Sequence, residues 1–397
     1  MRILVLTPTF LPVIGGAEIV LWQVFRRLSK RHEVLLVTPS LSASLIKDFA
    51  KNEEDYPIPF PVRRFNDRIT LIRIPGHRKL KGLIPPFSLS AIFAVRAALR
   101  EFKADIVNVH YTIPTGLAAV YADTVRGIPT VLTLNGRDVP GPIVPPFWKY
   151  WHRLIAARCS EITYVSEYCR RAVFGNKKIG IVTWNGVDMA TVKIGTAEHL
   201  RRRLNIPDKS RVVFALQRLA DEKRTDIIIS AMPGILARCP DVFMVMGGTG
   251  PEEASLKNLA RQLGVADRVV FTGFIDEGDV GDYFNLCDVF MFHTVYETFG
   301  IVLAQAMAYG KPVVSIWNTA VPDVVLDGQT GILTKPYDPA AMADAAVRLL
   351  ENPALREKLG ACGRKRALEL FDWDKIADKY ETVFLETLAR RRGSTGA

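Results

Sequence analysis

The strongest constraint on this chain is a repeated unit: a short apolar run rich in β-branched residues, then a segment of helical period. Apolar runs that do not alternate with polar residues indicate strands buried on both faces, as in parallel sheets covered by helices. The first half contains such runs at residues 3–6, 34–37, 105–109, 130–134 and 161–165. The second half contains them at 212–216, 242–246, 269–272, 289–292, 312–316 and 331–334. The sequence therefore predicts an α/β protein with two doubly wound domains.

The chain has 397 residues, a length that fits two domains of ordinary size. The pair Asn185-Gly186 ends a predicted strand, and a polar, basic run precedes Pro207 and the next strand. Three successive helices without an intervening strand are expected at 338–350, 353–370 and 374–392. The predicted boundaries are an N-terminal domain 1–187, a linker 188–208, a C-terminal domain 209–373 and a returning helix with a disordered end, 374–397. Residues 393–397 form that disordered end.

The basic residues are unevenly distributed. Lys and Arg total 52 against 41 Asp and Glu, a net charge of +11, and residues 61–103 alone contain ten basic and two acidic side chains. Apolar residues interrupt this stretch at helical spacing, so it is expected to contact an anionic membrane surface; a solvated, purely structural face would show the same pattern. The stretch lacks a nucleic-acid-binding motif, so nucleic acid is not an expected partner.

The N-terminal segment lacks the apolar core of a signal peptide, and no apolar run reaches the roughly twenty residues of a membrane helix. The expected location is the cytoplasm, with a possible peripheral position on the inner face of the membrane. The five cysteines are scattered, without a C-x-x-C pair or a neighbouring histidine, so neither a disulfide framework nor a zinc site is expected. No acidic pair follows a strand in the manner of a metal site, and no metal or other cofactor is predicted.

Gly15 and Gly16 follow the first predicted strand and open a helix. Paired glycines at a helix start expose backbone N–H groups to a phosphate, although a tight turn would also explain them. The corresponding loop of the second domain holds Arg218 and Lys223, whose side chains could neutralise a diphosphate or simply form a charged surface at a helix start. The loop 247–252 adds Gly248 and Gly250 on the same predicted sheet edge.

The most informative segment is residues 296–312, which follow the predicted strand 289–292. Residues 300–309 have the period of a buried helix, so the amides of Phe299 and Gly300 would lie at its N-terminus. Glu297 lies just before this helix, and Gln305 lies between one and two turns inside it, where an amide can bind a hydroxyl. A carboxylate beside an anion-binding helix start is expected to bind sugar hydroxyls; a helix-capping glutamate is the alternative.

These four motifs, in this order, resemble those of the retaining nucleotide-sugar glycosyltransferases of family 4. The resemblance covers nearly the whole chain and is carried by Gly15-Gly16-Ala17-Glu18, Arg218 with Lys223, residues 248–251, and Glu297-Thr298-Phe299-Gly300 with the small-residue helix up to Pro312. It implies the GT-B fold, two facing Rossmann-like domains with a C-terminal helix packed back on the first. It also implies a donor of the UDP or GDP sugar type, retention at the anomeric carbon, no metal, and an acceptor in a lipid-linked glycan, polysaccharide or glycolipid.

The resemblance also implies roles for single residues. Gly16, Arg218 and Lys223 would hold the diphosphate, and Glu297 the hydroxyls of the transferred sugar. The catalytic group would be His110, Arg218, Lys223 and Glu297. The donor-binding group would be Gly15, Gly16, Gly248, Gly250, Phe274, Ile275, Phe299, Gly300, Ile301 and Gln305, with Phe274 and Ile275 near the nucleobase. Asn135 and Asp138 would lie on the acceptor side.

The chain departs from the family pattern at two positions. Gln305 replaces a glutamate that usually binds the ribose, and Asn135 replaces a histidine found in many members. An amide still accepts a hydrogen bond but carries no charge and transfers no proton. These departures motivate a second hypothesis, a nucleotide-sugar-binding protein with little or no turnover. An epimerase or a phosphorylase on the same fold is a third.

Overall fold

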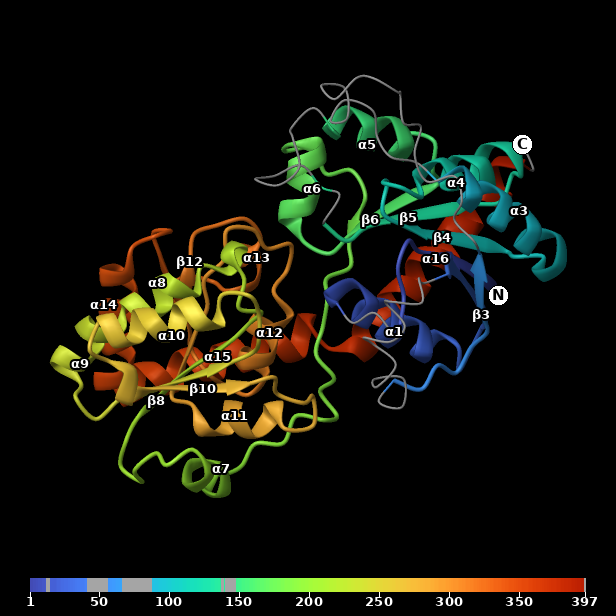
Figure 1. Cartoon of the computed structure of the whole chain (residues 1–397). Helices are drawn as coiled ribbons and strands as arrows, with labels where there is room; N and C mark the ends of the chain where they lie inside the picture. Colours follow the sequence, from blue (N-terminus) through green and yellow to red (C-terminus); the bar gives the residue numbers. More distant parts are fainter. Residues whose placement is uncertain (12–14, 41–55, 66–87, 137–138, 140–147, 396–397) are drawn as a thin grey trace. The chain divides into compact units, whose positions relative to one another are not determined.

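The computed structural model describes residues 1–11, 15–40, 56–65, 88–136, 139 and 148–395. These residues form two compact units, each built around its own sheet (Figure 1). Unit 1 consists of Met1–Asn185 and Trp373–Ala397, and unit 2 of Gly186–Asp372. The division after Asn185 falls close to the predicted end of the first domain at residue 187.

Unit 1 contains a seven-stranded sheet with the order β3-β2-β1-β4-β5-β6-β7, and every pairing is parallel. The strands are β1 (Arg2–Leu6), β2 (Glu33–Pro39), β3 (Val62–Phe65), β4 (Ile106–His110), β5 (Thr130–Leu134), β6 (Glu161–Tyr164) and β7 (Ile181–Val182). The central strands are buried along their length because helices cover both faces of the sheet. The edge strand β3 was not predicted: Arg63 and Arg64 break its apolar pattern.

One face of this sheet is covered by a row of helices. They are α3 (Leu89–Phe102), α4 (Gly116–Val120) with the π-helical turn η3 (Tyr121–Val125), α5 (Trp148–Ala156) and α6 (Glu167–Phe174). Their apolar sides join one cluster with the strands, which includes Val95, Ala119, Ile155 and Val173. The N-caps Ser88 and Ser166 each accept a backbone N–H of the first turn, which fixes where α3 and α6 begin.

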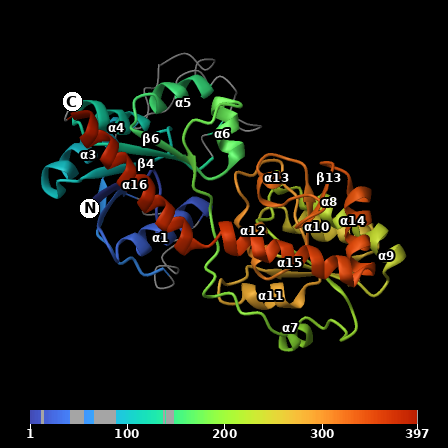
Figure 2. The same cartoon turned by 180° about the vertical axis from the view of Figure 1, so that it is seen from behind.

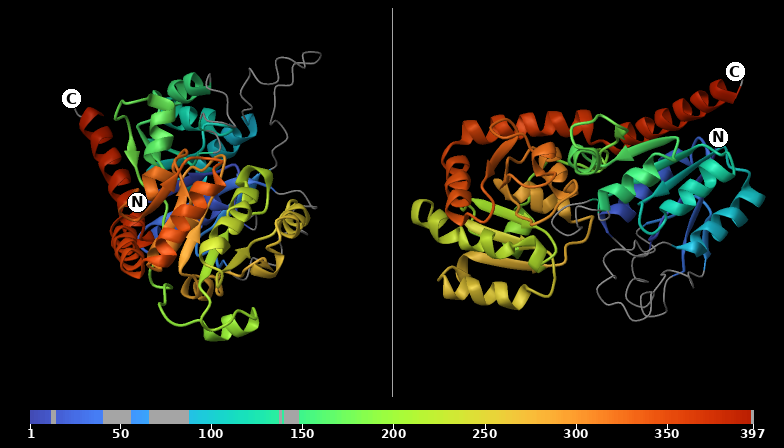
Figure 3. Two further views of the ribbon diagram at one scale, coloured as in Figure 1. Left: turned by 90° about the vertical axis from the view of Figure 1, so that its left-hand side faces the viewer. Right: turned by 90° about the horizontal axis from the view of Figure 1, so that it is seen from above.

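The other face is covered by α1 (Gly16–Leu28) and by the last helix of the chain, α16 (Trp373–Thr395). Figure 2 shows α16 crossing the sheet, and both views in Figure 3 show it on the outside of unit 1. Trp373, Tyr380 and Phe384 are at most 1% exposed and anchor it. Arg27 pairs with Asp374 at 2.5 Å and Arg31 with Asp378 at 2.7 Å, so a row of ion pairs borders the apolar contact.

Unit 2 contains a six-stranded parallel sheet with the order β10-β9-β8-β11-β12-β13. The strands are β8 (Val212–Leu216), β9 (Phe243–Gly247), β10 (Val269–Gly273), β11 (Val289–Met291), β12 (Val313–Ile316) and β13 (Gly331–Thr334). The helices are α7 (Glu198–Arg203), α8 (Thr225–Ser230), α9 (Met232–Arg238), α10 (Glu253–Gln262), α11 (Val280–Leu286), α12 (Ile301–Ala308), α13 (Val321–Val324), α14 (Pro339–Glu351) and α15 (Pro353–Leu370), with the 3-10 turns η4 (Asp221–Lys223) and η5 (Ala266–Arg268). The predicted pair of doubly wound α/β sheets is confirmed.

Two predicted segments differ from the structure. The proposed linker 188–208 belongs to unit 2 and contains α7, whose His199 pairs with Asp282 of α11 at 2.9 Å. The segment was predicted as a linker because α7 contains three consecutive arginines, but its Leu200 is fully buried. The predicted disordered tail 393–397 is also too long, because α16 continues to Thr395. Residues 396 and 397 lie outside the described part of the chain.

The glycine-rich loop after β9 lies against the loop after β8. Leu219 N–H donates to the Thr249 carbonyl at 2.9 Å, and Glu252 N–H donates to the Leu219 carbonyl at 3.0 Å. A Cβ at Gly248 would lie 2.0 Å from the Gln217 carbonyl oxygen, and one at Gly250 would lie 2.1 Å from that of Leu219. Glycine is therefore required here by the close approach of two backbones, which holds the segment that carries Arg218.

Replacing Phe384 by alanine should destabilise unit 1 by about 3–5 kcal/mol, because a fully buried aromatic ring of α16 would leave a cavity. The adjacent Leu385, 51% exposed on the same helix, provides the matched control. Leu385→Ala should cost below about 1 kcal/mol. Calorimetric unfolding of both variants measures the difference, and equal losses would show that α16 does not stabilise unit 1 through this contact.

Gly248→Ala should destabilise unit 2 more than Gly264→Ala. Both glycines have positive φ, +115° and +68°, but a Cβ at Gly264 has no atom within 4 Å. Gly264→Ala should therefore cost only about 1–2 kcal/mol, the usual penalty of a left-handed conformation. Gly248→Ala also forces the Gln217 backbone to move. Thermal denaturation midpoints measure both, and a similar decrease in the two variants would contradict the packing role of Gly248.

Candidate functional site

The candidate residues of unit 2 gather where the strand order of its sheet reverses. Strands β8 and β11 are neighbours, but the chain proceeds from β8 outward to β10 before returning to β11. In open parallel sheets ligands bind beyond the carboxyl ends of the strands at such a point. The loop after β8 carries Arg218 and Lys223, and the loop after β11 carries Glu297.

Lys223 and Glu297 are in direct contact. Lys223 Nζ lies 2.9 Å from Glu297 Oε2, and the two side chains are only 21% and 17% exposed. Lys223 Nζ also lies 5.5 Å from the centre of the Phe292 ring. Because both side chains are partly buried, the attraction between them is stronger than in water, and either charge would be destabilising without its partner. The pair therefore holds an ammonium and a carboxylate in fixed positions at the sheet edge.

The loop that carries Glu297 is tied to the loop after β12. Glu297 N–H donates to Thr319 Oγ1 at 3.0 Å, and Ala320 N–H donates to the Glu297 carbonyl at 3.2 Å. The Asn318 side chain donates to the Val295 carbonyl at 2.7 Å. Three interactions from one neighbouring loop therefore fix the backbone on which the Glu297 carboxylate stands.

Arg218 and the start of α12 add donors to the same unit. The Arg218 side chain is 64% exposed and pairs only loosely with Glu222, at 3.8 Å. Gly300 is the N-cap of α12 with φ +86°, and it supplies no side-chain cap. The first amides of the helix, beginning with Ile301, are donors without an intrahelical partner by helix geometry. Phe299 is buried, with its ring 5.2 Å from that of Phe371.

The other residues predicted to bind the nucleotide-sugar donor differ in their exposure to solvent. Phe274 is 71% exposed after β10, whereas Ile275 is buried and approaches Gly247. Gln305 lies half-buried in the second turn of α12. Gly248 and Gly250 pack against the backbone that precedes Lys223, as described above.

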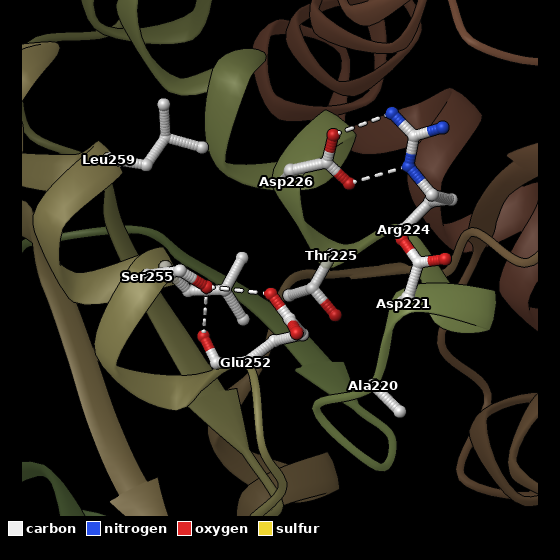
Figure 4. Close-up of a pocket in the computed structure, with 9 residues that line it drawn as sticks. Ala220, Asp221, Arg224, Thr225, Asp226, Glu252, Ser255 and Leu259 are labelled. Carbon is white, nitrogen blue, oxygen red and sulfur yellow. Dashed lines mark hydrogen bonds and ion pairs between the residues drawn. The ribbon is translucent and has the colours of Figure 1, made fainter.

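A hollow of about 290 Å³, whose lining residues Figure 4 shows, includes none of Arg218, Lys223 and Glu297. It is lined by Asp221, Asp226 and Glu252 among others, and its one cation, Arg224, forms a two-pronged pair with Asp226. Three carboxylates and a neutralised guanidinium do not suit a diphosphate. The groups whose charge would suit an anion are those at the ends of β8 and β11.

The candidate residues of unit 1 also lie at a reversal of strand order, between β1 and β4. Gly15 is the N-cap of α1, with extended φ of −155°, and Gly16 is its exposed first residue. Glu18 is buried and accepts a hydrogen bond from the Thr9 hydroxyl. A Cβ at Gly15 would lie 2.6 Å from Glu18 Oε2, the end of a flexible side chain, so neither the extended backbone nor a rigid neighbour requires glycine there.

His110, at the end of β4, is only 1% exposed. Its Nε2 lies 2.8 Å from Asn108 Oδ1, and its Nδ1 lies 2.9 Å from Asn135 Nδ2. Burial lowers the pKa of His110 to about 3, and the hydrogen bond with Asn135 opposes this shift in part. The imidazole is therefore neutral at physiological pH, with both nitrogens engaged by protein groups.

Of the two residues predicted to lie on the acceptor side, the structure describes only Asn135. Asn135 follows β5 directly and bonds His110, so the structure brings these two together. Asp138 lies outside the described residues.

Sequence reasoning gave no role to Asn108 or His293. Asn108 is a polar residue inside an apolar strand, two positions before His110 and thus on the same face of the sheet, a signal that the spacing contained. His293 follows β11 and is fully buried; its Nε2 accepts the Tyr337 N–H at 3.2 Å, and burial lowers its pKa to about 4. Among the described residues, no group of three or more His, Cys, Asp or Glu side chains is placed to hold a metal ion.

Comparison with known proteins matches both halves of the chain to glycosyltransferase models. Residues 14–191 match the model described as Glycosyltransferase Family 4, and residues 196–366 match Glycosyl transferases group 1. N-acetyl-alpha-D-glucosaminyl L-malate synthase of Bacillus anthracis is 26% identical over 387 residues, 96% of each chain. Phosphatidyl-myo-inositol mannosyltransferase of Mycobacterium leprae is 30% identical over 309 residues, 75% of this chain and 78% of the relative.

Among solved structures, Alr3699/HepE of Anabaena in complex with UDP superimposes with a TM-score of 0.78 at 23% identity, over 97% of this chain and 100% of that one. This similarity supports the GT-B fold. The match of both halves and the mannosyltransferase relative show that the chain belongs to glycosyltransferase family 4.

Proposed function

We propose that this protein transfers a hexose-type sugar from a uridine or guanosine diphosphate sugar to a hydroxyl acceptor, with retention of anomeric configuration and without a metal ion. Unit 2 binds the donor and unit 1 the acceptor. The single observation that carries the proposal is the 2.9 Å contact of Lys223 with Glu297 where the strand order of unit 2 reverses.

The charges in unit 2 suit a reaction in which a nucleoside diphosphate leaves. Lys223, the exposed guanidinium of Arg218 and the first amides of α12 supply positive potential for the developing charge of the diphosphate. Glu297, held by Lys223, presents acceptor lone pairs to sugar hydroxyls. These interactions strengthen as the bond to the diphosphate breaks, which is the requirement for transition-state stabilisation.

The names of similar proteins support the donor and acceptor classes in this proposal. Alr3699/HepE was crystallised with UDP and with UDP-glucose, and the mannosyltransferase relatives are named for GDP-mannose and phosphatidylinositol. The Bacillus anthracis relative is named as a synthase of N-acetyl-alpha-D-glucosaminyl L-malate. A nucleoside diphosphate is printed for Alr3699/HepE and for the GDP-mannose-dependent relatives, whereas the named acceptors differ. We favour a lipid-linked glycan, polysaccharide or glycolipid acceptor.

A peripheral membrane position on the cytoplasmic side fits the described part of the basic stretch 61–103. On α3, Phe93 is 60% exposed, and Arg96 and Arg100 are exposed one and two turns further along. An aromatic residue in line with two arginines suits the interface of an anionic bilayer. None of the described helices combines the length and apolar content needed to cross a bilayer. Residues 66–87 of the stretch lie outside the described part.

A second candidate function is donor binding without turnover, which Gln305 and Asn135 favour. A nucleotide sugar would then bind at Lys223 and Arg218 without product formation. Stabilisation by a panel of uridine, guanosine and adenosine diphosphate sugars identifies the donor under either hypothesis, and a transfer assay with that donor separates them.

Lys223→Ala and Arg218→Ala should each lower kcat/KM for transfer by about 10²–10³-fold, on the scale of losing one preorganised partner of a developing charge. Arg238→Ala is the matched control, since it removes a half-exposed cation of unit 2 that pairs with Asp344, away from the loops after β8 and β11. The control should stay within about twofold of wild type. Wild-type rates in both site variants would contradict the proposed role of Lys223 and Arg218 in binding the diphosphate.

Arg96→Glu combined with Arg100→Glu should weaken flotation with liposomes that contain anionic lipid, because both charges on the exposed side of α3 are reversed. Lys358→Glu combined with Lys365→Glu, two exposed positions of α15, makes the same change in net charge on unit 2. This control should bind as wild type does. Flotation that is insensitive to salt and equal in the two double variants would exclude membrane contact through α3.

A further inference from the structure

Two large residues beside the candidate site of unit 2 adopt a backbone conformation that favours glycine. Arg224 has φ +44° and directly follows Lys223 at the end of the turn η4, and Tyr337 has φ +60° and lies between β13 and α14. A side chain in this left-handed region strains the backbone, and such strain persists only where the surrounding contacts hold it. The contacts of these two side chains therefore indicate what the strained conformations support.

The Arg224 guanidinium is held from two directions. Its Nε donates to Asp226 Oδ1 at 2.9 Å and its Nη2 to Asp226 Oδ2 at 2.7 Å, the two-pronged pair drawn in Figure 4. The hydrogen bond from Arg224 lowers the pKa of the Asp226 carboxyl, so the pair stays ionised at neutral pH. The central carbon of the guanidinium also lies 5.1 Å from the centre of the Tyr337 ring, which is a cation–π contact. Arg224 therefore connects the end of η4 to the loop after β13.

The Tyr337 ring stands on a backbone that His293 holds. Tyr337 N–H donates to His293 Nε2 at 3.2 Å, and the two rings lie 5.4 Å apart. Burial, and to a lesser extent the charge of Arg224, lower the pKa of the fully buried His293 to about 4. At neutral pH its Nε2 therefore carries a lone pair and accepts the bond from Tyr337. The ring over Arg224 is thus fixed through a residue that directly follows the neighbourhood of β11.

The turn η4 is held on both sides of Lys223. Before this residue, the Glu222 carbonyl accepts the Val295 N–H at 2.8 Å, a bond to the loop after β11. At the residue itself, the Lys223 carbonyl accepts Gln217 Nε2 at 3.2 Å, and the contacts of Arg224 follow directly. A glycine would adopt the conformation of residue 224 without strain, so the backbone alone gives no reason for an arginine there.

The contacts of Arg224 add little to the stability of the fold. The side chains of Arg224 and Asp226 are 32% and 39% exposed, and Tyr337 is 48% exposed. An ion pair and a cation–π contact with this exposure have a free energy similar in size to the strain of a left-handed residue, so one offsets the other. Their remaining effect is geometric, because they hold the end of η4 in one position.

We propose that Arg224 and Tyr337 are positioning residues, which hold the turn η4 so that the Lys223 ammonium faces Glu297 and the diphosphate of the donor. This inference rests on the proposed function for the identity of the ligand. Both residues act through Lys223, whose Nζ lies 2.9 Å from Glu297 Oε2. Because Asp226 already neutralises Arg224, we assign the contact with the diphosphate to Lys223 and not to Arg224.

Variants of Tyr337 test the connection, because this residue is half-exposed and far from Lys223 in the sequence. Tyr337→Ala and Arg224→Ala should each lower kcat/KM for transfer by about tenfold, since two other hydrogen bonds still hold η4. Tyr337→Phe keeps the ring over Arg224 and should stay within about twofold of wild type. In the Arg224→Ala background, Tyr337→Ala should change kcat/KM less than about twofold. Equal losses in the alanine and phenylalanine variants of Tyr337, or losses that multiply in the double variant, would overturn the proposal.

Arg224→Gly separates positioning from stability. Relief of the strain offsets the lost contacts, so the thermal midpoint should stay within about 4 °C of wild type while kcat/KM falls about tenfold. Asn205→Gly is the matched control, since it places glycine at another left-handed residue of unit 2, with φ +54° on the exposed surface, and should retain wild-type activity. Unchanged activity of Arg224→Gly, or a loss matched by a large fall in the midpoint, would contradict a positioning role.

The Lys223→Ala background tests whether Arg224 acts through its neighbour. Arg224→Gly should change kcat/KM less than about twofold when residue 223 is already alanine. A direct contact of the Arg224 guanidinium with the diphosphate would persist in this background, and a further tenfold loss there would refute the proposal.

Hydrogen exchange tests the positioning without any assay of transfer. The Lys223 N–H donates to the Ala220 carbonyl at 2.9 Å, and the Arg224 N–H donates to the Asp221 carbonyl at 3.1 Å. Tyr337→Ala should raise the exchange rates of these two amides by at least about tenfold, whereas Tyr337→Phe should leave them unchanged. Unchanged rates in Tyr337→Ala would refute the positioning. A protein that transfers no sugar and binds neither UDP nor GDP, but shows this difference in exchange, would contradict the proposed function and leave the positioning of Lys223 intact.

Discussion

A parallel sheet with helices on both faces leaves only the ends of its strands for chemistry, and both units of this protein obey that constraint. The central strands are buried along their whole length, so polar side chains concentrate in the loops that follow them. Each sheet reverses its strand order once, between β1 and β4 in unit 1 and between β8 and β11 in unit 2. Loops diverge at these points, and Gly15, Gly16 and His110 in unit 1 and Arg218, Lys223 and Glu297 in unit 2 follow the strands that flank them.

The side chains near the two points of strand reversal differ in charge. In unit 2 the side chains are charged: Lys223 and Glu297 form a half-buried ion pair, with the exposed Arg218 nearby in the sequence. Such a pair stabilises the fold little, because desolvation offsets much of the attraction. Its value is that both charges are held in place before a ligand arrives. In unit 1 the buried groups on β4 and β5 are neutral amides and an uncharged imidazole, which can orient a hydroxyl without a net field.

The sequence predicted elements well where one physical signal dominated and poorly where two competed. The buried strands stood out because their apolar runs do not alternate. The edge strand β3 was missed because Arg63 and Arg64 are tolerated on its half-exposed surface, and α7 was missed because its single buried residue, Leu200, is followed by three arginines. Glu297 and Lys223 were predicted as members of one site, but their contact joins residues far apart in sequence. Gly248 was predicted from the sequence to bind the ligand. The close approach of the Gln217 backbone already requires a glycine at this position, and a sequence pattern cannot reveal such a contact.

The neutrality of His110 constrains the chemistry of the proposed transfer. An imidazole with a pKa near 3, and with both nitrogens hydrogen-bonded inside the sheet, can neither take the proton of an acceptor hydroxyl nor carry a positive charge at physiological pH. Asn135 has no proton to exchange either. Under the proposed function we expect the acceptor proton to pass to an oxygen of the departing diphosphate, whose charge Lys223 and Arg218 would neutralise. That route requires attack from the same side as departure, and this is the geometry that retains the anomeric configuration.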